Sequence, residues 1–249
     1  MSDPGLLLSA VLLPLFPFSI VFNALLERLQ HPLLRSLLLL GWPQAGLWTL
    51  SNHVAGVPDW FAFWAMASSL LYAFRLVSMR EMGRWTGFLG TSAWALLWLP
   101  LTTGTPAGEL WISATAFSIP LVFLALLADT LENRFGAAYT GLYGGLARSM
   151  PRFSGVLVLS VLAATATPLF PGFFAMLQAL IVSQPVPAVG LAGIWLIWSW
   201  AGARLLQGLI VGSADPAADH DIGMISTWGY ATGLIGLIVA GLILTGGRL

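Results

Sequence analysis

Few side chains in this sequence could do chemistry, and two of them lie in long apolar segments. Arg204 sits in the run from Trp200 to Leu205, and Gln178 follows Phe170-Pro171-Gly172. A polar or ionisable group within an apolar span is energetically expensive, which makes both residues candidates for an ion pathway. Two structural alternatives stay open. An arginine near the end of a span also reaches toward lipid head groups, and a glutamine also bonds a neighbouring helix.

No motif for catalysis or metal binding emerges from the remaining polar residues. Asp219-His220-Asp221 combines ligand-type side chains, but its spacing matches no established metal motif and favours a solvated acidic loop. The sequence shows no Ser-His-Asp pattern and no phosphate-binding glycine loop, and it contains no cysteine. We therefore predict no catalytic residue, no metal site, no cofactor and no enzymatic activity of its own.

Proline pairs mark two places where apolar segments should break. Proline removes a backbone donor and clashes with the preceding helical turn. Two similar stretches, Pro14-Leu15-Phe16-Pro17-Phe18 and Pro168-Leu169-Phe170-Pro171-Gly172-Phe173, therefore each predict a helix broken in mid-membrane. The two stretches lie in the first and the sixth apolar span, so the broken helices should run in opposite directions, as in inverted-repeat transporters. Coincidence in a chain rich in proline and leucine is the alternative. The candidate helix-break or ion-pathway residues are Pro14, Pro17, Pro168, Pro171, Gly172, Gln178 and Arg204.

Composition indicates that these segments cross a membrane. Of 249 residues, 58% are hydrophobic and 8% are charged, whereas a soluble domain carries about 25% charged residues. The formal net charge is zero, so no nucleic-acid partner is expected. Apolar runs of the length needed for a span occur near 5–26, 33–52, 57–79, 85–104, 107–129, 153–183, 188–211 and 223–246. We predict an all-α integral membrane protein of about eight transmembrane helices, forming one domain over residues 1–249.

Arginine placement predicts the orientation. All ten basic residues are arginine. The odd-numbered loops hold Arg28, Arg35, Arg80, Arg84, Arg134, Arg148 and Arg152, with Arg75 just inside a span, whereas the even-numbered loops hold none and the far tail has only Arg248. Because cytoplasmic loops carry the positive charge, the odd loops should face the cytoplasm, and both termini the outer side.

The stretch Gly144-Gly145-Leu146-Ala147-Arg148-Ser149-Met150-Pro151, followed by an apolar run to Phe170-Pro171-Gly172, resembles the antiporter-like membrane subunits. This family includes the proton-pumping subunits of respiratory complex I, the Mrp antiporter subunits and the membrane subunit of bacterial inorganic-carbon accumulating complexes. Phe16-Pro17-Phe18 with His31-Pro32 resembles the family's first broken helix and the turn after it, and the segment 73–104 resembles its inter-repeat region.

The resemblance implies a half-length member. The family has about fourteen helices in two inverted five-helix repeats, and this chain matches the last eight. Residues 1–52 would be the end of a first repeat, 85–211 a complete second repeat, and 223–246 the final helix. The family moves protons along buried lysines, but this chain has no lysine. The positions that the resemblance assigns to those lysines hold other residues: Leu12, Gly41, Trp42, Ile119, Pro120, Met176, Gln178 and Ala179. The position expected for one histidine holds Ser19.

A chain that resembles this family but lacks the lysines of its proton relay indicates an accessory, non-conducting subunit. The complex would be coupled to protons or cations and would be of the inorganic-carbon, Mrp or complex I type. Expected partners are other membrane subunits, foremost a conducting antiporter-like subunit, then lipid and a soluble or peripheral enzyme. The expected location is the bacterial inner membrane. The alternative is a self-sufficient small ion or solute transporter that uses the two helix breaks as its binding site.

Overall fold

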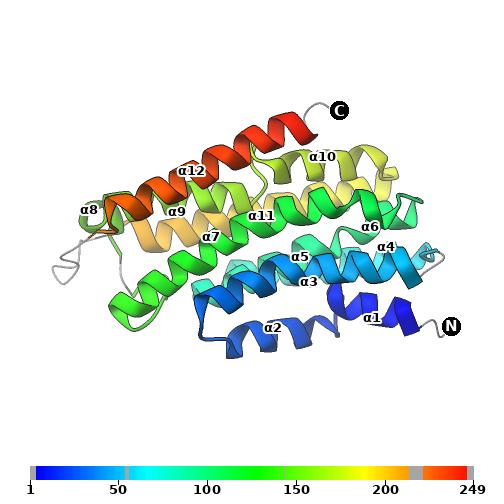
Figure 1. The fold of residues 1–249 in the computed structure, drawn as a ribbon, viewed down its shortest axis with the longest axis horizontal. Coiled ribbons are helices and arrows are strands. Elements are labelled where there is room, and N and C mark those ends of the chain that lie inside the picture. The colour runs from blue at the N-terminus through cyan, green and yellow to red at the C-terminus, as the bar shows by residue number, and fades with distance from the viewer. Residues whose placement is uncertain (1–3, 54–55, 143, 213–220, 246–249) are drawn as a thin grey trace.

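The computed structural model describes residues 4–53, 56–142, 144–212 and 221–245, and it shows an elongated bundle of helices (Figure 1). The first helix begins and the last helix ends at the same end of the bundle (Figure 1). This agrees with the even number of crossings that the sequence predicts. Asp219 and His220 of the predicted acidic loop lie outside the described residues.

The described helices follow one another with short connections. In chain order they are α1 (Pro4–Leu12), α2 (Ser19–Arg28), α3 (Pro32–His53), α4 (Trp60–Ser78), α5 (Met82–Ala95), α6 (Trp98–Thr102), the 3-10 turn η1 (Ala107–Glu109), α7 (Trp111–Phe135), α8 (Leu146–Ser149), α9 (Pro151–Ala164), α10 (Pro171–Val182), α11 (Pro185–Ile210), α12 (Met224–Ala240) and the π-helical turn η2 (Gly241–Thr245).

The predicted all-α membrane fold is confirmed. Each predicted apolar run coincides with one helix or with two helices in line. Four segments are long and apolar enough to cross a membrane uninterrupted: α4, α7, α11 and the run Met224–Ile243 that begins with α12. Most of the remaining runs are divided by a break, because paired or late prolines end a helix before it has crossed.

Both predicted breaks are present, and their two helix pairs point in opposite directions along the bundle (Figure 1). The first separates α1 from α2 at residues 13–18, and the second separates α9 from α10 at residues 165–170. A third interruption, between α5 and α6 at Leu96 and Leu97, was not predicted. Its signal was Pro100, whose ring clashes with the carbonyl four residues earlier, that of Leu96.

The glycines of the family-like loop have a structural explanation. Gly145 adopts a φ of 78°, in the left-handed region that glycine enters without a steric penalty, and directly precedes α8. A side chain on Gly144 would place its Cβ 3.0 Å from the carbonyl oxygen of Val211, just beyond α11. This loop therefore packs tightly on the end of α11 and directs the chain into α9.

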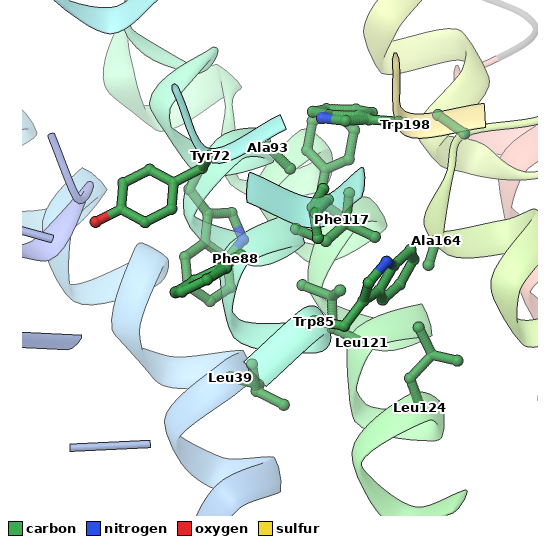
Figure 2. Close-up of a cluster of buried hydrophobic side chains, with 14 of the residues drawn as sticks. Leu39, Tyr72, Trp85, Phe88, Ala93, Phe117, Leu121, Leu124, Ala164 and Trp198 are labelled. Atoms are coloured by element: carbon green, nitrogen blue, oxygen red, sulfur yellow. The ribbon is translucent and has the colours of Figure 1, made fainter. Parts of the chain in front are cut away.

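The core is dominated by large aromatic side chains at the centre of the bundle. Helix α7 packs against α3, α5 and α9, and α4 packs against α5 and α11. Figure 2 shows Trp85, Phe117 and Trp198 among the buried side chains between these helices, and the ring centroids of Phe117 and Trp198 lie 6.3 Å apart, edge to face. Trp85, Trp94, Trp98 and Trp198 are each completely buried. Burial of such rings excludes water from the middle of the molecule.

Candidate functional site

The first helix break is closed by indole N–H groups from other helices. Trp98 donates to the carbonyl oxygen of Leu13 at 3.0 Å, and Trp64 donates to that of Phe16 at 2.6 Å. Trp42 reaches the carbonyl oxygen of Val11 at 3.2 Å. Backbone groups freed by a break must be bonded by protein or must line a cavity. Here tryptophans supply those bonds, so each of these carbonyl oxygens already has a hydrogen-bond donor within the protein.

The second break is closed in the same way. The indole of Trp195, on α11, donates to the carbonyl oxygens of Thr165 at 3.2 Å and of Ala166 at 3.1 Å. The backbone turns here through two non-glycine residues of positive φ, Ala166 at 56° and Leu169 at 88°. Such conformations are uncommon for side chains with a Cβ and persist where the surroundings hold them. The indole of Trp195 is one contact that holds this turn.

The predicted break residues fall into two separate groups. Pro14 is buried and Pro17 is exposed at the first break, and at the second Pro168 is exposed while Pro171 and Gly172 are buried. The turn between α5 and α6 lies between the groups. Trp98 of α6 bonds the first break, whereas Leu96 and Leu97 line a cavity of about 40 Å³ with residues of α10.

Gln178 and Arg204 lie apart from both breaks. Gln178 is exposed at the rim of that small cavity, and its side chain has no hydrogen-bond partner in the described part of the chain. Arg204 is exposed near the end of α11 and lines an open groove together with Arg80. The structure therefore does not bring the candidate polar residues together into one site, and their role in an ion pathway stays a prediction.

The polar side chains buried between the helices are neutral serines, threonines and one asparagine among the described residues. The hydroxyls of Ser19 and Tyr72 bond each other at 2.7 Å, and the Asn23 amide donates to the hydroxyl of Thr91 at 3.1 Å. The Ser92 hydroxyl accepts a bond from the Trp198 indole at 2.9 Å. Among the described residues, no buried side chain is a carboxylate, an arginine or a histidine. Hydroxyls and amides keep their protons near neutral pH, so this network lacks the titrating groups of a proton relay.

Sequence reasoning had not identified this buried network. Small polar residues in apolar spans are its signal, because in lipid they bond across helices. Ser69 and Ser92, for example, come from α4 and α5, and their hydroxyls lie 2.9 Å apart. Which serines and threonines take part depends on helix rotation, and in segments apolar all round periodicity does not give that rotation.

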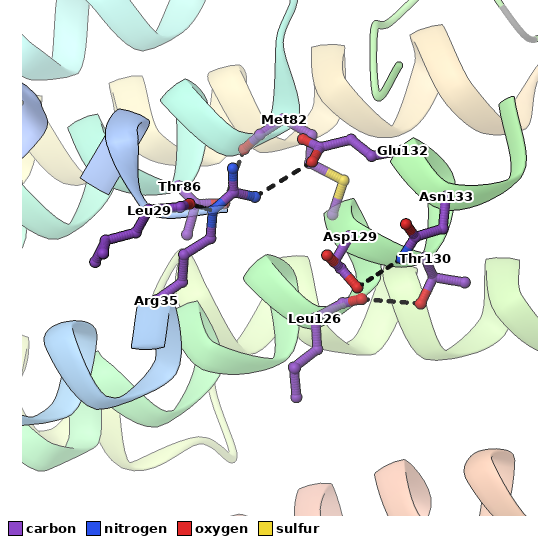
Figure 3. Close-up of polar contacts among 9 residues, drawn as sticks. All are labelled: Leu29, Arg35, Met82, Thr86, Leu126, Asp129, Thr130, Glu132 and Asn133. Carbon is purple, nitrogen blue, oxygen red and sulfur yellow. Dashed lines mark hydrogen bonds and ion pairs between the residues drawn. The ribbon is translucent and has the colours of Figure 1, made fainter. Parts of the chain in front are cut away.

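Charged groups gather instead at the arginine-bearing end of the bundle. Arg35 forms an ion pair with Glu132 at 3.3 Å, joining α3 to α7 (Figure 3). Arg84 pairs with Glu27 at 3.3 Å and with Glu81 at 3.0 Å. The guanidinium groups of Arg35 and Arg84 rim a cavity of about 180 Å³ that reaches inward as far as Asn23. Beyond Asn23 the polar contacts continue through neutral groups.

Asp221, the described member of the predicted acidic loop, has a structural role. Its carboxylate accepts hydrogen bonds from the backbone N–H groups of Arg152 at 2.6 Å and Phe153 at 3.1 Å, at the start of α9. A carboxylate at a helix N-terminus satisfies free donors and the helix dipole. No group of three potential metal ligands occurs within the described ranges.

Comparisons with known proteins identify the fold. No protein-family model matches the chain, and no curated protein matches it in sequence. Among solved structures, a chain of respiratory complex I from Thermus thermophilus with bound NADH superposes with a TM-score of 0.81 at 22% identity, over 94% of this chain and 52% of that one. A chain of the Mrp complex from Dietzia sp. DQ12-45-1b superposes with a TM-score of 0.82 at 15% identity, over 96% and 55%. The chain thus has the fold of these two chains and spans about half their length.

Proposed function

We propose that this chain is an accessory, non-conducting membrane subunit of a multi-subunit complex coupled to protons or cations. In this role it braces a separate antiporter-like subunit that conducts. The observation that carries the proposal is the neutral interior: the described residues place no carboxylate, arginine or histidine in the buried core. A proton path needs groups that bind and release protons near neutral pH.

The closed helix breaks support the same role. In transporters, broken helices present free backbone groups to a substrate or ion at mid-membrane. Here the carbonyls of Leu13, Phe16, Thr165 and Ala166 already accept hydrogen bonds from tryptophan indoles. The breaks stabilise the shape of the bundle without offering an open binding position.

The proposed subunit has expected partners, a membrane and an orientation. The partners are other membrane subunits, with a peripheral enzyme at the arginine-bearing end, in the bacterial inner membrane with both termini outside. The complex is of the inorganic-carbon, Mrp or complex I type. Residues 1–52 are the end of one repeat and 85–211 the second, inverted one, followed by a last helix over 223–246.

The test is purification of the chain from its native membrane in mild detergent, followed by mass spectrometry and by proton and cation flux assays in proteoliposomes. We expect stoichiometric recovery of a larger antiporter-like subunit. The purified chain alone should give no flux above empty liposomes, whereas the complex should give flux. Flux from the chain alone would contradict the accessory role.

A self-sufficient transporter is the second candidate, favoured by the two antiparallel broken helices. It predicts a stable oligomer of this chain alone, with flux that falls when Gln178→Ala or Arg204→Gln is introduced. Flux from the wild type that both variants leave unchanged would exclude these two residues from the pathway.

A further inference from the structure

An open groove of about 990 Å³ lies between α4 and α11, outside the region of the helix breaks. One wall is the end of α4 with the segment 78–80, and the other is the last part of α11, including Arg204 and Gln207. The segment 139–142 closes its end. Polar side chains share this lining with apolar ones such as Phe74 and Leu205, so the groove is amphipathic.

Among the residues that the structure describes, the two arginines of this groove have no carboxylate as an ion-pair partner. Arg80 and Arg204 are both exposed. The described residues that line the groove include no aspartate and no glutamate. The neighbouring Glu81 already pairs with Arg84 at 3.0 Å and accepts a hydrogen bond from the Tyr139 hydroxyl at 3.4 Å. The charged side chains among the described lining residues are therefore both arginines.

Backbone contacts hold the groove in shape. The N–H of Thr140 donates to the carbonyl oxygen of Arg80 at 2.7 Å, and the N–H of Gly141 donates to that of Gly208 at 3.0 Å. These two bonds tie the segment 139–142 to both walls. A Cβ on Gly208 would lie 2.9 Å from the Cβ of Thr140, so the close approach depends on glycine there. The two arginines thus project from a preformed frame.

We propose that this groove binds the head group of an anionic phospholipid. Both arginines belong to the end of the bundle that carries the other loop arginines, which the positive-inside bias assigns to the cytoplasm. Arg204 lies six residues before the end of α11 at Ile210, a rise of about 9 Å, while Arg80 lies two residues beyond the end of α4 at Ser78. Guanidinium groups bind phosphate oxygens through paired hydrogen bonds. The apolar part of the lining receives the first methylene groups of the lipid tails.

The chemistry of the lining favours a lipid over a soluble anion. A free phosphate is hydrated on every side and gains nothing from Phe74, Val77 or Leu205. A phospholipid presents its phosphate at the membrane surface and its hydrocarbon just below, so one molecule can contact both the arginines and the apolar side chains of the groove. Basic pockets between transmembrane helices on the cytoplasmic side suit such head groups.

The test uses the full chain in detergent and native mass spectrometry, with titration of phosphatidylglycerol or phosphatidylcholine. The variant is Arg80→Gln/Arg204→Gln, with Arg80→Lys/Arg204→Lys as the form that keeps the charge. The matched control is Arg28→Gln/Arg148→Gln, which removes two exposed arginines from the same end but outside the groove. Elution of each variant as the wild-type species confirms that it is folded.

We expect the wild type and the control to retain phosphatidylglycerol in preference to phosphatidylcholine. Each arginine removed from the groove should weaken that binding about fivefold, and both together about thirtyfold. The lysine form should keep most of the preference. Equal losses in the control and in the groove variant, or no preference for the anionic lipid, would overturn the proposal. Displacement of the lipid by millimolar inorganic phosphate would assign the groove to a free anion and would also overturn it.

Discussion

Replacement of Trp195 by phenylalanine tests whether indole hydrogen bonds hold the helix breaks. The variant Trp195→Phe keeps an aromatic ring beside Phe173, whose ring centroid lies 5.5 Å from that of Trp195. It removes the N–H that bonds the carbonyl oxygens of Thr165 and Ala166. Thr165 and Ala166 are buried, with 2% and 0% of their surfaces exposed, so water does not readily replace this donor.

The expected loss follows from this geometry. A buried carbonyl without a partner costs about 1–3 kcal/mol, and interhelical hydrogen bonds in membrane proteins contribute about 0.6–1.7 kcal/mol. We therefore expect Trp195→Phe to lower the free energy of unfolding by about 1–2 kcal/mol, close to a tenfold change in the unfolding equilibrium. The amides at the second break should also exchange hydrogen faster.

The matched control lies on the same helix. Trp200 is 63% exposed and makes no hydrogen bond to a described residue, so Trp200→Phe should change stability by less than about 0.5 kcal/mol. Unfolding would be followed by circular dichroism of the helices as dodecyl sulfate is added to the protein in mild detergent. Equal midpoints for the two variants, with unchanged exchange at the break, would refute the role assigned to the indole.

Three further variants probe packing, capping and charge, each read by the same unfolding titration. Gly46→Ala should lower the free energy of unfolding by about 1–3 kcal/mol, because the added Cβ would lie 2.8 Å from Cγ of Leu13. The control Gly41→Ala, on the same helix, meets nothing within 4 Å and should be neutral or slightly stabilising. Equal effects of the two variants would contradict the close approach at Gly46. Asp221→Ala should lower stability by about 1 kcal/mol and speed amide exchange at Arg152 and Phe153, and unchanged exchange there would argue against the cap. Arg35→Gln should destabilise more than Arg84→Gln, because the Arg35 side chain is 15% exposed and that of Arg84 48%; the reverse order would contradict this.

Proline content by itself does not say where a span breaks. Pro43 lies inside α3 and Pro120 inside α7, and both helices continue through them. The breaks that the sequence predicted correctly each hold two prolines three residues apart, and the single Pro100 accompanies the interruption that was missed. Neighbouring side chains decide the rest, since a broken turn persists where donors such as Trp98 and Trp195 reach its carbonyls.

The acidic loop shows a similar division. From its residue types Asp221 could be read only as part of a solvated loop. As the cap of α9 it bonds residues that lie 68 and 69 positions earlier in the chain. A local sequence pattern cannot predict contacts over such a separation. The charged groove of Arg80 and Arg204 likewise needs the ends of α4 and α11 to lie side by side.

The sequence alone determined what depends on composition and local chemistry. Apolar runs of membrane length required helices, because a backbone in lipid must satisfy its own hydrogen bonds. Paired prolines required two breaks, and the sequence contains no lysine. Only the tertiary structure decided which tryptophans close those breaks, which serines and threonines bond one another, and which arginines pair with a carboxylate. Those outcomes depend on how each helix is rotated against its neighbours, and segments that are apolar on every face carry little pattern to specify that rotation.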